Sequence, residues 1–279
     1  MDRDLRIRDR RAREQAIARR VVIRRALPAL TVTLAAVLLA SCGKGGSTSS
    51  IASTPRSGAS RSGASKSGGG GKSAPVTHAR ALAYANAVNL TASDVPGFTA
   101  SERHEHDTAR ERRLEHEMTS CAGLTGASKG VLEAGSKSFE LKRGVVNLSV
   151  SSEVSVEPSV ARAQQLRDAV ASPRVRGCFS RYVGLLLRSL HVKGASIGPV
   201  TIQSGTPPAP GTGGGFGWRI TASFAVRGVK LPFYLDILGF VDGPSEVTLT
   251  SSGLLRPFPA EAQQHLYALL LARAKAHAL

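Results

Sequence analysis

The sequence predicts an α+β domain over residues 77–279, with helices packed on an antiparallel sheet of four to five or more strands. Two kinds of periodicity support this prediction. Apolar and polar residues alternate over several long runs, as they do on half-buried strands, and other runs repeat apolar residues at helical spacing. These runs follow the order helix, strand, two helices, several strands and a final helix, which is typical of helices packed on an antiparallel sheet.

The strongest strand signal lies at residues 216–226, where apolar residues occupy every second position. Arg227 and Gly228 predict a turn, after which the alternation resumes over residues 229–237, so we expect a β-hairpin. Pro232 lacks a backbone N–H and is therefore expected at a sheet edge or in a bulge.

The same alternation predicts further strands. Residues 246–250 follow a turn at residues 242–244 and complete a meander with the hairpin. A long strand is expected over residues 146–156, where Val and Leu share one parity and Asn, Ser and Glu share the other. Residues 195–203 are a candidate for a fifth strand.

Helices are expected between and after these strands. Ser159 is a suitable N-cap for a helix that runs to about Ala171, and a second helix follows Pro173. Another begins after Pro259. The charged segment 102–122 carries only a narrow apolar stripe, so we expect a helix on the surface there.

Residues 1–41 have the layout of a secretory signal peptide. An Arg-rich stretch precedes the uncharged residues 26–40, which are too few to span a bilayer as a permanent helix, because that needs roughly 20 residues. The segment ends in Leu39-Ala40-Ser41-Cys42, which resembles the lipobox of bacterial lipoproteins at every position. The resemblance implies diacylglycerol on the Cys42 sulfur and cleavage before it, on the extracytoplasmic face of the cell membrane. The alternative is a buried Cys after an uncleaved membrane helix.

Residues 42–76 are expected to form a lipid-anchored, Gly/Ser-rich flexible linker. They consist almost entirely of Gly, Ser, Ala, Thr, Lys and Arg. Such a stretch cannot bury enough apolar area to offset the entropy that ordering it would cost. We therefore expect a tether between the lipid on Cys42 and the domain.

The formal net charge of +17 is unevenly distributed. Residues 1–41 hold ten Arg and four acidic residues, and residues 44–72 hold five basic and no acidic residues, which leaves +6 for the rest of the chain. A domain with that balance is only mildly basic, and its Phe and Tyr residues lie in strand and helix patterns rather than between clustered Lys and Arg. We therefore expect no nucleic-acid partner.

The chain contains three cysteines. With Cys42 lipidated, Cys121 and Cys178 remain as a pair in a compartment where disulfides persist, and we predict a bond between them. That bond would fasten the C-terminal end of the 102–122 helix to the helix after Pro173. The alternatives are two separate buried thiols or a catalytic Cys.

The beginning of the domain resembles a known group of proteins. The run Leu-Thr-Ala-Ser-Asp-Val-Pro-Gly-Phe at residues 90–98, and the later order of strand, Pro158-Ser159, Ala-rich helix and Cys178, are similar to lipoproteins of high-GC Gram-positive bacteria. Related α/β sandwiches are the extracellular sensor domain of the H-type mycobacterial receptor kinase and lipoproteins likened to the Mog1/PsbP fold. The resemblance covers roughly residues 85–275, and it implies a ligand-binding or accessory role rather than a reaction.

Metal and phosphate sites are both poorly supported by the residues. His104, Glu105, His106 and His116 are of metal-ligand types, but their spacing on a helix separates them, which favours a solvated charged face. Residues 211–217 are rich in Gly but lead into a strand, whereas phosphate binding requires a helix N-terminus, so a mobile loop is expected instead.

Four acidic residues, Glu153, Glu157, Asp236 and Asp242, lie in or beside expected strands. Two carboxylates that face each other across a sheet can perform acid–base chemistry at the spacing used by glycosidases. The sequence does not place any two of them opposite each other, and surface charge is the simpler interpretation.

The sequence favours a non-catalytic, extracytoplasmic ligand-binding or sensing module that is attached to the membrane through Cys42. No nucleophile, base or metal ligand stands in a motif that would activate it, so neither an enzymatic activity nor a cofactor is expected. Trp218, Phe224, Phe233 and Tyr182 are expected in the core, and a gap beside them would suit an apolar or amphipathic small molecule, lipid or protein segment. The alternatives are an envelope protein-interaction module and a cell-wall hydrolase.

Overall fold

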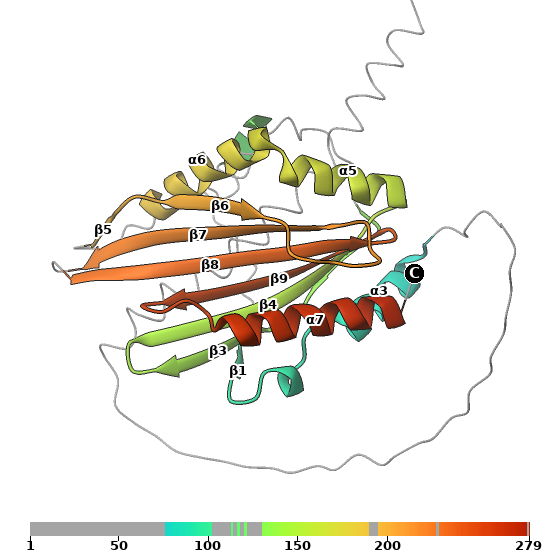
Figure 1. The fold of residues 1–279 in the computed structure, drawn as a ribbon, viewed down its shortest axis with the longest axis horizontal. Coiled ribbons are helices and arrows are strands. Elements are labelled where there is room, and N and C mark those ends of the chain that lie inside the picture. The colour runs from blue at the N-terminus through green and yellow to red at the C-terminus, as the bar shows by residue number, and fades with distance from the viewer. Residues whose placement is uncertain are drawn as a thin grey trace, which may run out of the picture.

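The computed structural model describes residues 76–101, 113, 116–117, 120–121, 130–189, 195–226, 229–277 and 279. The predictions for the signal peptide, for Cys42, for nearly all of the linker and for His104, Glu105 and His106 lie outside these residues. Within the described part of the chain, the fold is an antiparallel sheet of nine strands with helices packed on it, which confirms the predicted α+β class (Figure 1).

The described elements follow one another from α3 to α7. The helices are α3 (His78–Val88), the short 3-10 helix η2 (Ala92–Asp94), α5 (Val160–Ala171), α6 (Pro173–Ser189) and α7 (Ala260–Ala276). The strands are β1 (Thr99–Ser101), β2 (Leu132–Gly135), β3 (Ser138–Arg143), β4 (Val146–Val156), β5 (Ala195–Ile197), β6 (Thr201–Gly205), β7 (Gly215–Val226), β8 (Val229–Asp242) and β9 (Ser245–Leu254).

The sheet has the order β1-β3-β4-β9-β8-β7-β5, with β2 paired to β4 and β6 paired to β7. The predicted hairpin and meander are confirmed, because β8 pairs with all of β7 through residues 229–240 and with all of β9 through residues 233–242. At the β8–β9 turn Asp242 lies opposite Ser245, and Gly243 has a φ of 56°, a left-handed conformation that Gly adopts without steric cost. Arg227 and Gly228, the expected turn between β7 and β8, lie outside the described residues.

The prediction for Pro232 is wrong, because β8 is an interior strand between β7 and β9 and its pairing with β7 is continuous. The carbonyl of Pro232 accepts a hydrogen bond from the Leu255 N–H at 2.8 Å, on the side where β9 lies. The β8–β9 ladder has already ended there, at Phe233 opposite Leu254. The N–H and C=O groups of one strand residue point to the same side. An N–H on residue 232 would therefore also point towards the β9 side, beyond the end of the ladder, so its absence removes no ladder hydrogen bond.

The segment expected to be a fifth strand, residues 195–203, is divided into β5 and β6, which both pair with β7. Gly198 and Pro199 lie between the two strands, and Pro cannot donate to a ladder. Helix α3 and the short strands β1, β2 and β3 were not among the predicted elements. Helix α3 is Ala-rich, and its N-cap Thr77 accepts a hydrogen bond from Arg80 N at 3.3 Å.

The three helices expected after Ser159, Pro173 and Pro259 are confirmed as α5, α6 and α7. The Ser159 hydroxyl caps α5 by accepting a hydrogen bond from Arg162 N at 3.2 Å. Pro259 immediately precedes α7. Residues 113, 116–117 and 120–121 are helical, as expected for the 102–122 segment, most of which lies outside the described residues.

Two pairs of helices cover opposite faces of the sheet. The pair α5 and α6 encloses one hydrophobic core, and the pair α3 and α7 encloses a second. Figure 1 shows α5 and α6 on one face, above β6, β7 and β8, and α3 and α7 on the other. The alternation of side chains along β8 divides this strand between the cores: Phe233, Leu235 and Ile237 contact the α5–α6 core, whereas Leu238 and Phe240 contact the α3–α7 core.

An ion pair joins the segment before β1 to helix α7. Arg273 donates to both carboxylate oxygens of Asp94, at 2.7 and 2.8 Å, and Asp94 also accepts from Thr91 N at 2.7 Å. The Asp94 side chain is only 9% exposed. Burial acts to raise the pKa of Asp94, but the hydrogen bonds from Arg273 and Thr91 and the charge of Arg273 together hold it below its ordinary value of 3.8.

Asp94→Ala is therefore expected to destabilise the fold by about 2 kcal/mol, since it leaves Arg273 without its partner and removes the cap on Thr91. Because the folded-state pKa is lowered, the contribution is present above pH 3.8 and is lost as the pH falls through the folded-state value. Urea unfolding at pH 7 and at pH 3 measures both effects. Asp168→Ala, which removes an exposed pair with Arg167, is the control and should cost less than about 0.5 kcal/mol; equal losses for the two variants would contradict the prediction.

Candidate functional site

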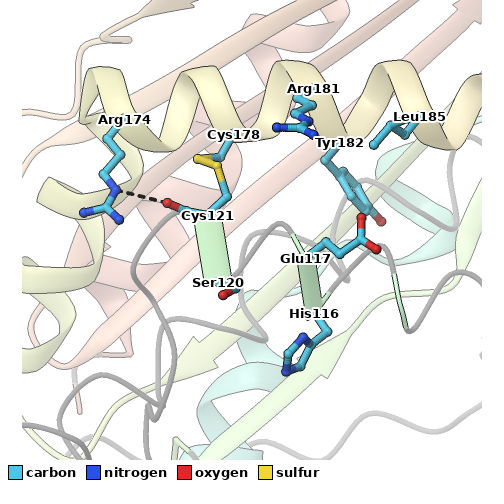
Figure 2. A pocket seen from close by; sticks show the side chains of 9 residues that line it. All are labelled: His116, Glu117, Ser120, Cys121, Arg174, Cys178, Arg181, Tyr182 and Leu185. Atoms are coloured by element: carbon cyan, nitrogen blue, oxygen red, sulfur yellow. Dashed lines mark hydrogen bonds between the residues drawn. A yellow bond between two sulfur atoms is a disulfide. The ribbon is translucent and has the colours of Figure 1, made fainter.

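A cavity of about 470 Å³ lies beside helix α6 (Figure 2). One wall is a face of α6, and the other is formed by the helical residues 116–121 that the structure describes. Its volume is within the range of small-molecule sites, which is about 300–1,000 Å³. The lining residues are His116, Glu117, Ser120, Cys121, Arg174, Cys178, Arg181, Tyr182 and Leu185.

The two walls of the cavity are joined covalently. Cys121 and Cys178 form a disulfide with a Cα–Cα distance of 5.8 Å, which confirms the predicted bond. The Nε–H of Arg174 also donates to the carbonyl oxygen of Cys121 at 3.0 Å, next to the disulfide (Figure 2). The shape of the cavity therefore depends on a bond whose partners lie 57 residues apart in the chain.

The floor of the cavity on the α6 side is apolar. Cys178, Tyr182 and Leu185 follow one another at helical spacing, and Tyr182 is only 2% exposed. Its ring stacks on Phe179 at a centroid distance of 6.2 Å, and Phe179 in turn lies 4.4 Å from Trp218 of β7. This aromatic stack fixes the side of α6 that faces the sheet, and so fixes the side that faces the cavity.

The four aromatic residues singled out in the sequence have two different positions. Trp218, Phe224 and Phe233 are buried in the core between α6 and the sheet, as expected. Tyr182 belongs to the same core and also lines the cavity.

The rim of the cavity is charged. Arg174 and Arg181 lie seven residues apart on α6, which puts them two turns apart on the same side of the helix, and both are exposed. Glu117 and His116 project from the opposite wall (Figure 2). The sequence did not single out either arginine, because nothing in their spacing distinguishes them from solvated charges on an amphipathic helix.

A second cavity of about 430 Å³ lies on the other flank of α6, against the loop between β5 and β6. Small side chains of α6 leave this space open, and Arg181 borders both cavities. The lining residues are Gly177, Ser180, Arg181, Gly184, Ile197, Gly198, Pro199 and Val200.

Two buried carboxylates lie side by side in the sheet. Thr248 is opposite Glu153 and Ser155 is opposite Glu246, so the Glu153 and Glu246 side chains project from the same face of the neighbouring strands β4 and β9. They are 4% and 1% exposed. Glu153 is one of the acidic residues expected in or beside a strand, whereas Glu246 is not among them. The alternation of Glu246, Thr248 and Thr250 was the available signal, and only the strand register places these residues beside β4.

Glu157, just after β4, is also buried, and it accepts a hydrogen bond from the Ser155 hydroxyl at 3.4 Å. Glu153, Glu157 and Glu246 all take part in further interactions. These carboxylates are therefore integrated in the packing of the sheet, and none of them lines the cavity beside α6.

Asp236 is engaged in a network under α7. It accepts hydrogen bonds from Arg219 Nε at 2.7 Å and from Gln263 Nε2 at 3.2 Å, and Gln263 also donates to the Ser251 hydroxyl at 2.6 Å. The hydrogen bond and the charge of Asp236 raise the pKa of Arg219. Both carboxylate oxygens of Asp236 are therefore engaged by side chains of β7 and α7.

Asp242 lies at the end of β8 and does not face Asp236. Burial raises its pKa, and the charge of Lys275 opposes this shift. The side chains of Asp236 and Asp242 are six positions apart on one strand, so the structure brings together neither these two residues nor either of them with Glu153.

The metal and phosphate interpretations gain no support from the described residues. No group of three His, Cys, Asp or Glu side chains among them is arranged to hold a metal ion, and His116 lines the cavity instead. In the Gly-rich segment, Gly213 N donates to the Val241 carbonyl at 2.7 Å and Gly214 accepts from Val241 N at 3.1 Å, so these backbone groups extend the sheet.

No helix in the described part of the chain is long and apolar enough to cross a membrane.

No family model and no curated protein matches this chain. Among solved structures, the extracellular domain of PknH from Mycobacterium tuberculosis is similar over 72% of this chain and 98% of its own, with 10% sequence identity and a TM-score of 0.36. This is the receptor-kinase sensor domain that the resemblance in sequence names.

Proposed function

We propose that this chain is a membrane-anchored extracytoplasmic lipoprotein whose domain binds a ligand without transforming it. Residues 1–41 serve as the signal peptide, the lipid on Cys42 is the anchor, and residues 42–76 are the tether. The single observation that carries the binding role is the cavity beside α6, because its walls are fixed by the Cys121–Cys178 disulfide and its lining combines an apolar floor with a charged rim.

The environment of the acidic residues supports binding rather than catalysis. General acid–base chemistry needs a carboxyl group within hydrogen-bond reach of a bound substrate. Glu153 and Glu246 are packed within the sheet, and Asp236 is held by Arg219 and Gln263, whereas the lining of the cavity has Glu117 as its acidic residue.

Two other functions remain as alternatives. A cell-wall hydrolase would use Glu153 and Glu246, which lie on one face of β4 and β9. An envelope interaction module would dock on a partner through an exposed face or edge of the sheet. A hydrolase differs from a binding protein in that it requires the two glutamates and turns over peptidoglycan.

Cys42→Ala is expected to abolish membrane anchoring, because the thiol is the attachment point for the lipid and residues 26–40 are too short to span the bilayer as a helix, which needs about 20 residues. Incorporation of radiolabelled palmitate and fractionation of cells would measure this loss. Cys178→Ala is the control and should keep the label. Equal labelling of Cys42→Ala and of the wild type would contradict the anchor.

The cavity can be tested by filling it. Native mass spectrometry of the full chain with an envelope extract is expected to detect a bound species, and Ser120→Trp, which places a large ring in the cavity, should remove it. Glu153→Gln should leave binding unchanged. A wild-type chain that captures nothing, or one that hydrolyses peptidoglycan and loses this activity on Glu153→Gln, would overturn the proposed function.

A further inference from the structure

We propose that the cavity beside α6 takes an amphiphile with an anionic, phosphate- or carboxylate-bearing head, which Arg174 and Arg181 bind while its apolar part contacts Tyr182 and Leu185. This inference rests on the proposed binding function and narrows it to a class of ligand. It depends on three features of the described structure: the charge of α6, the disposition of its arginines and the apolar floor.

The charge of α6 is entirely positive. Its seventeen residues include four arginines and no acidic residue. One of them, Arg176, faces the other flank and donates to the Ser204 hydroxyl at 2.9 Å, whereas Arg174 and Arg181 line the cavity. The lining includes Glu117 as its acidic side chain, so two guanidinium groups outweigh one carboxylate. An anion therefore enters this site more favourably than a cation.

The two arginines offer hydrogen-bond donors to oxyanions. Guanidinium groups bind carboxylate and phosphate oxygens through pairs of parallel N–H donors. In the described part of the structure, Arg174 uses Nε for the Cys121 carbonyl, which fixes the guanidinium group at the rim, and this bond does not use its terminal nitrogens (Figure 2). Seven residues correspond to about 10 Å of helix, so a head at one arginine leaves room for the rest of the ligand to extend towards the other.

The α6 side of the cavity is apolar. Cys178, with its disulfide, lies between the two arginines along α6, and Tyr182 and Leu185 follow Arg181. Tyr182 is 2% exposed and is held by Phe179, so this floor is preformed. Cys178 is also buried, at 6% exposed, and Leu185 is partly exposed, so an alkyl or aromatic portion of the ligand would pack chiefly on Leu185.

Three probes distinguish the contribution of the anionic head to binding from that of the apolar tail. Isothermal titration of the full-length Cys42→Ser chain, which lacks the anchoring lipid, is carried out with dodecyl phosphate, dodecyl maltoside and inorganic phosphate, each below micelle-forming concentrations. Dodecyl phosphate is expected to bind at least about tenfold more tightly than either of the others, since only it engages both the arginines and the floor. Equal affinity for dodecyl maltoside, or for inorganic phosphate alone, would overturn the proposal.

Variants of α6 identify the groups responsible. Arg181→Glu reverses an exposed charge at the rim and should weaken binding of dodecyl phosphate by at least about tenfold, and Arg174→Ala should do so to a similar extent. Arg176→Ala, on the same helix but outside the cavity, is the matched control and should bind as the parent chain does. Unchanged binding in Arg181→Glu would contradict the assignment.

Bulky substitutions distinguish the two cavities that Arg181 borders. Ser120→Trp fills the cavity described above and should abolish binding, whereas Ser180→Trp fills the second cavity and should leave it unchanged. The reverse result would overturn the location. A neutral molecule from the envelope extract that binds the wild type and is lost on Ser120→Trp would refute the anionic class while the proposed binding function stands.

Discussion

Removing the disulfide by Cys121→Ser together with Cys178→Ala is expected to lower the free energy of unfolding by about 3–4 kcal/mol. The bond joins residues separated by 57 positions, so its loss returns a long loop to the unfolded chain and increases the entropy of that state. It also disconnects the two walls of the cavity, leaving the Arg174–Cys121 hydrogen bond as their described direct link. Urea unfolding followed by circular dichroism measures the change.

Chemical reduction provides the matched control for this variant. Treating the wild type with dithiothreitol should reproduce the loss of stability, and the double variant should not respond to the reductant. A double variant that is as stable as the oxidised wild type would show that the bond contributes nothing to the fold. The same variant should bind dodecyl phosphate at least about tenfold more weakly than the chain with the disulfide.

Phe179→Ala is expected to destabilise the domain by about 3–5 kcal/mol, because a fully buried ring is replaced by a cavity in the core between α6 and the sheet. The ring contacts Tyr182 and Trp218, at centroid distances of 6.2 and 4.4 Å, so its loss also frees the floor of the ligand cavity. Urea unfolding measures the loss of stability, and near-ultraviolet circular dichroism reports the environment of Trp218.

Two further substitutions serve as comparisons for the destabilisation by Phe179→Ala. Val145→Ala, at a residue that is 73% exposed, should change the stability by no more than about 0.5 kcal/mol. Phe179→Leu keeps most of the buried volume and should cost less than Phe179→Ala, which provides a folded variant for binding measurements. A loss below about 1 kcal/mol for Phe179→Ala would mean that α6 does not pack on β7 as described.

Helix α6 contributes both to the stability of the domain and to the proposed binding site. The helix contacts the sheet through Phe179, the facing wall through Cys178, and the cavity through Tyr182 and the two rim arginines. A ligand held there would add contacts across both walls. Such a ligand would raise the temperature of unfolding in proportion to the logarithm of its concentration.

The periodic part of the fold was predictable because the signals are local. Strands β7, β8, β4 and β9 are long, and apolar and polar residues alternate over much of each. Helix α5 follows a Ser N-cap, so the signal for each of these elements lies within its own segment. The Cys121–Cys178 pair followed from counting cysteines in a chain whose sequence predicts export to an oxidising compartment. Helix α3 was missed because its Ala-rich sequence gives little contrast between its buried and exposed sides.

The sequence by itself determined the class of the fold, its main hairpins, three of its helices and its disulfide. The tertiary structure decided which distant elements are neighbours. Strand β4 lies beside β9, which brings Glu153 and Glu246 to one face, and α6 lies beside residues 116–117 and 120–121, which gives a cavity lined by Arg174 and Arg181. Hydrogen-bonding between strands and packing between helices depend on residues far apart in the chain, so no local period contains this information. For the same reason the role of an arginine on α6 could not be predicted from its own segment, because that role depends on the residues that the fold places opposite it.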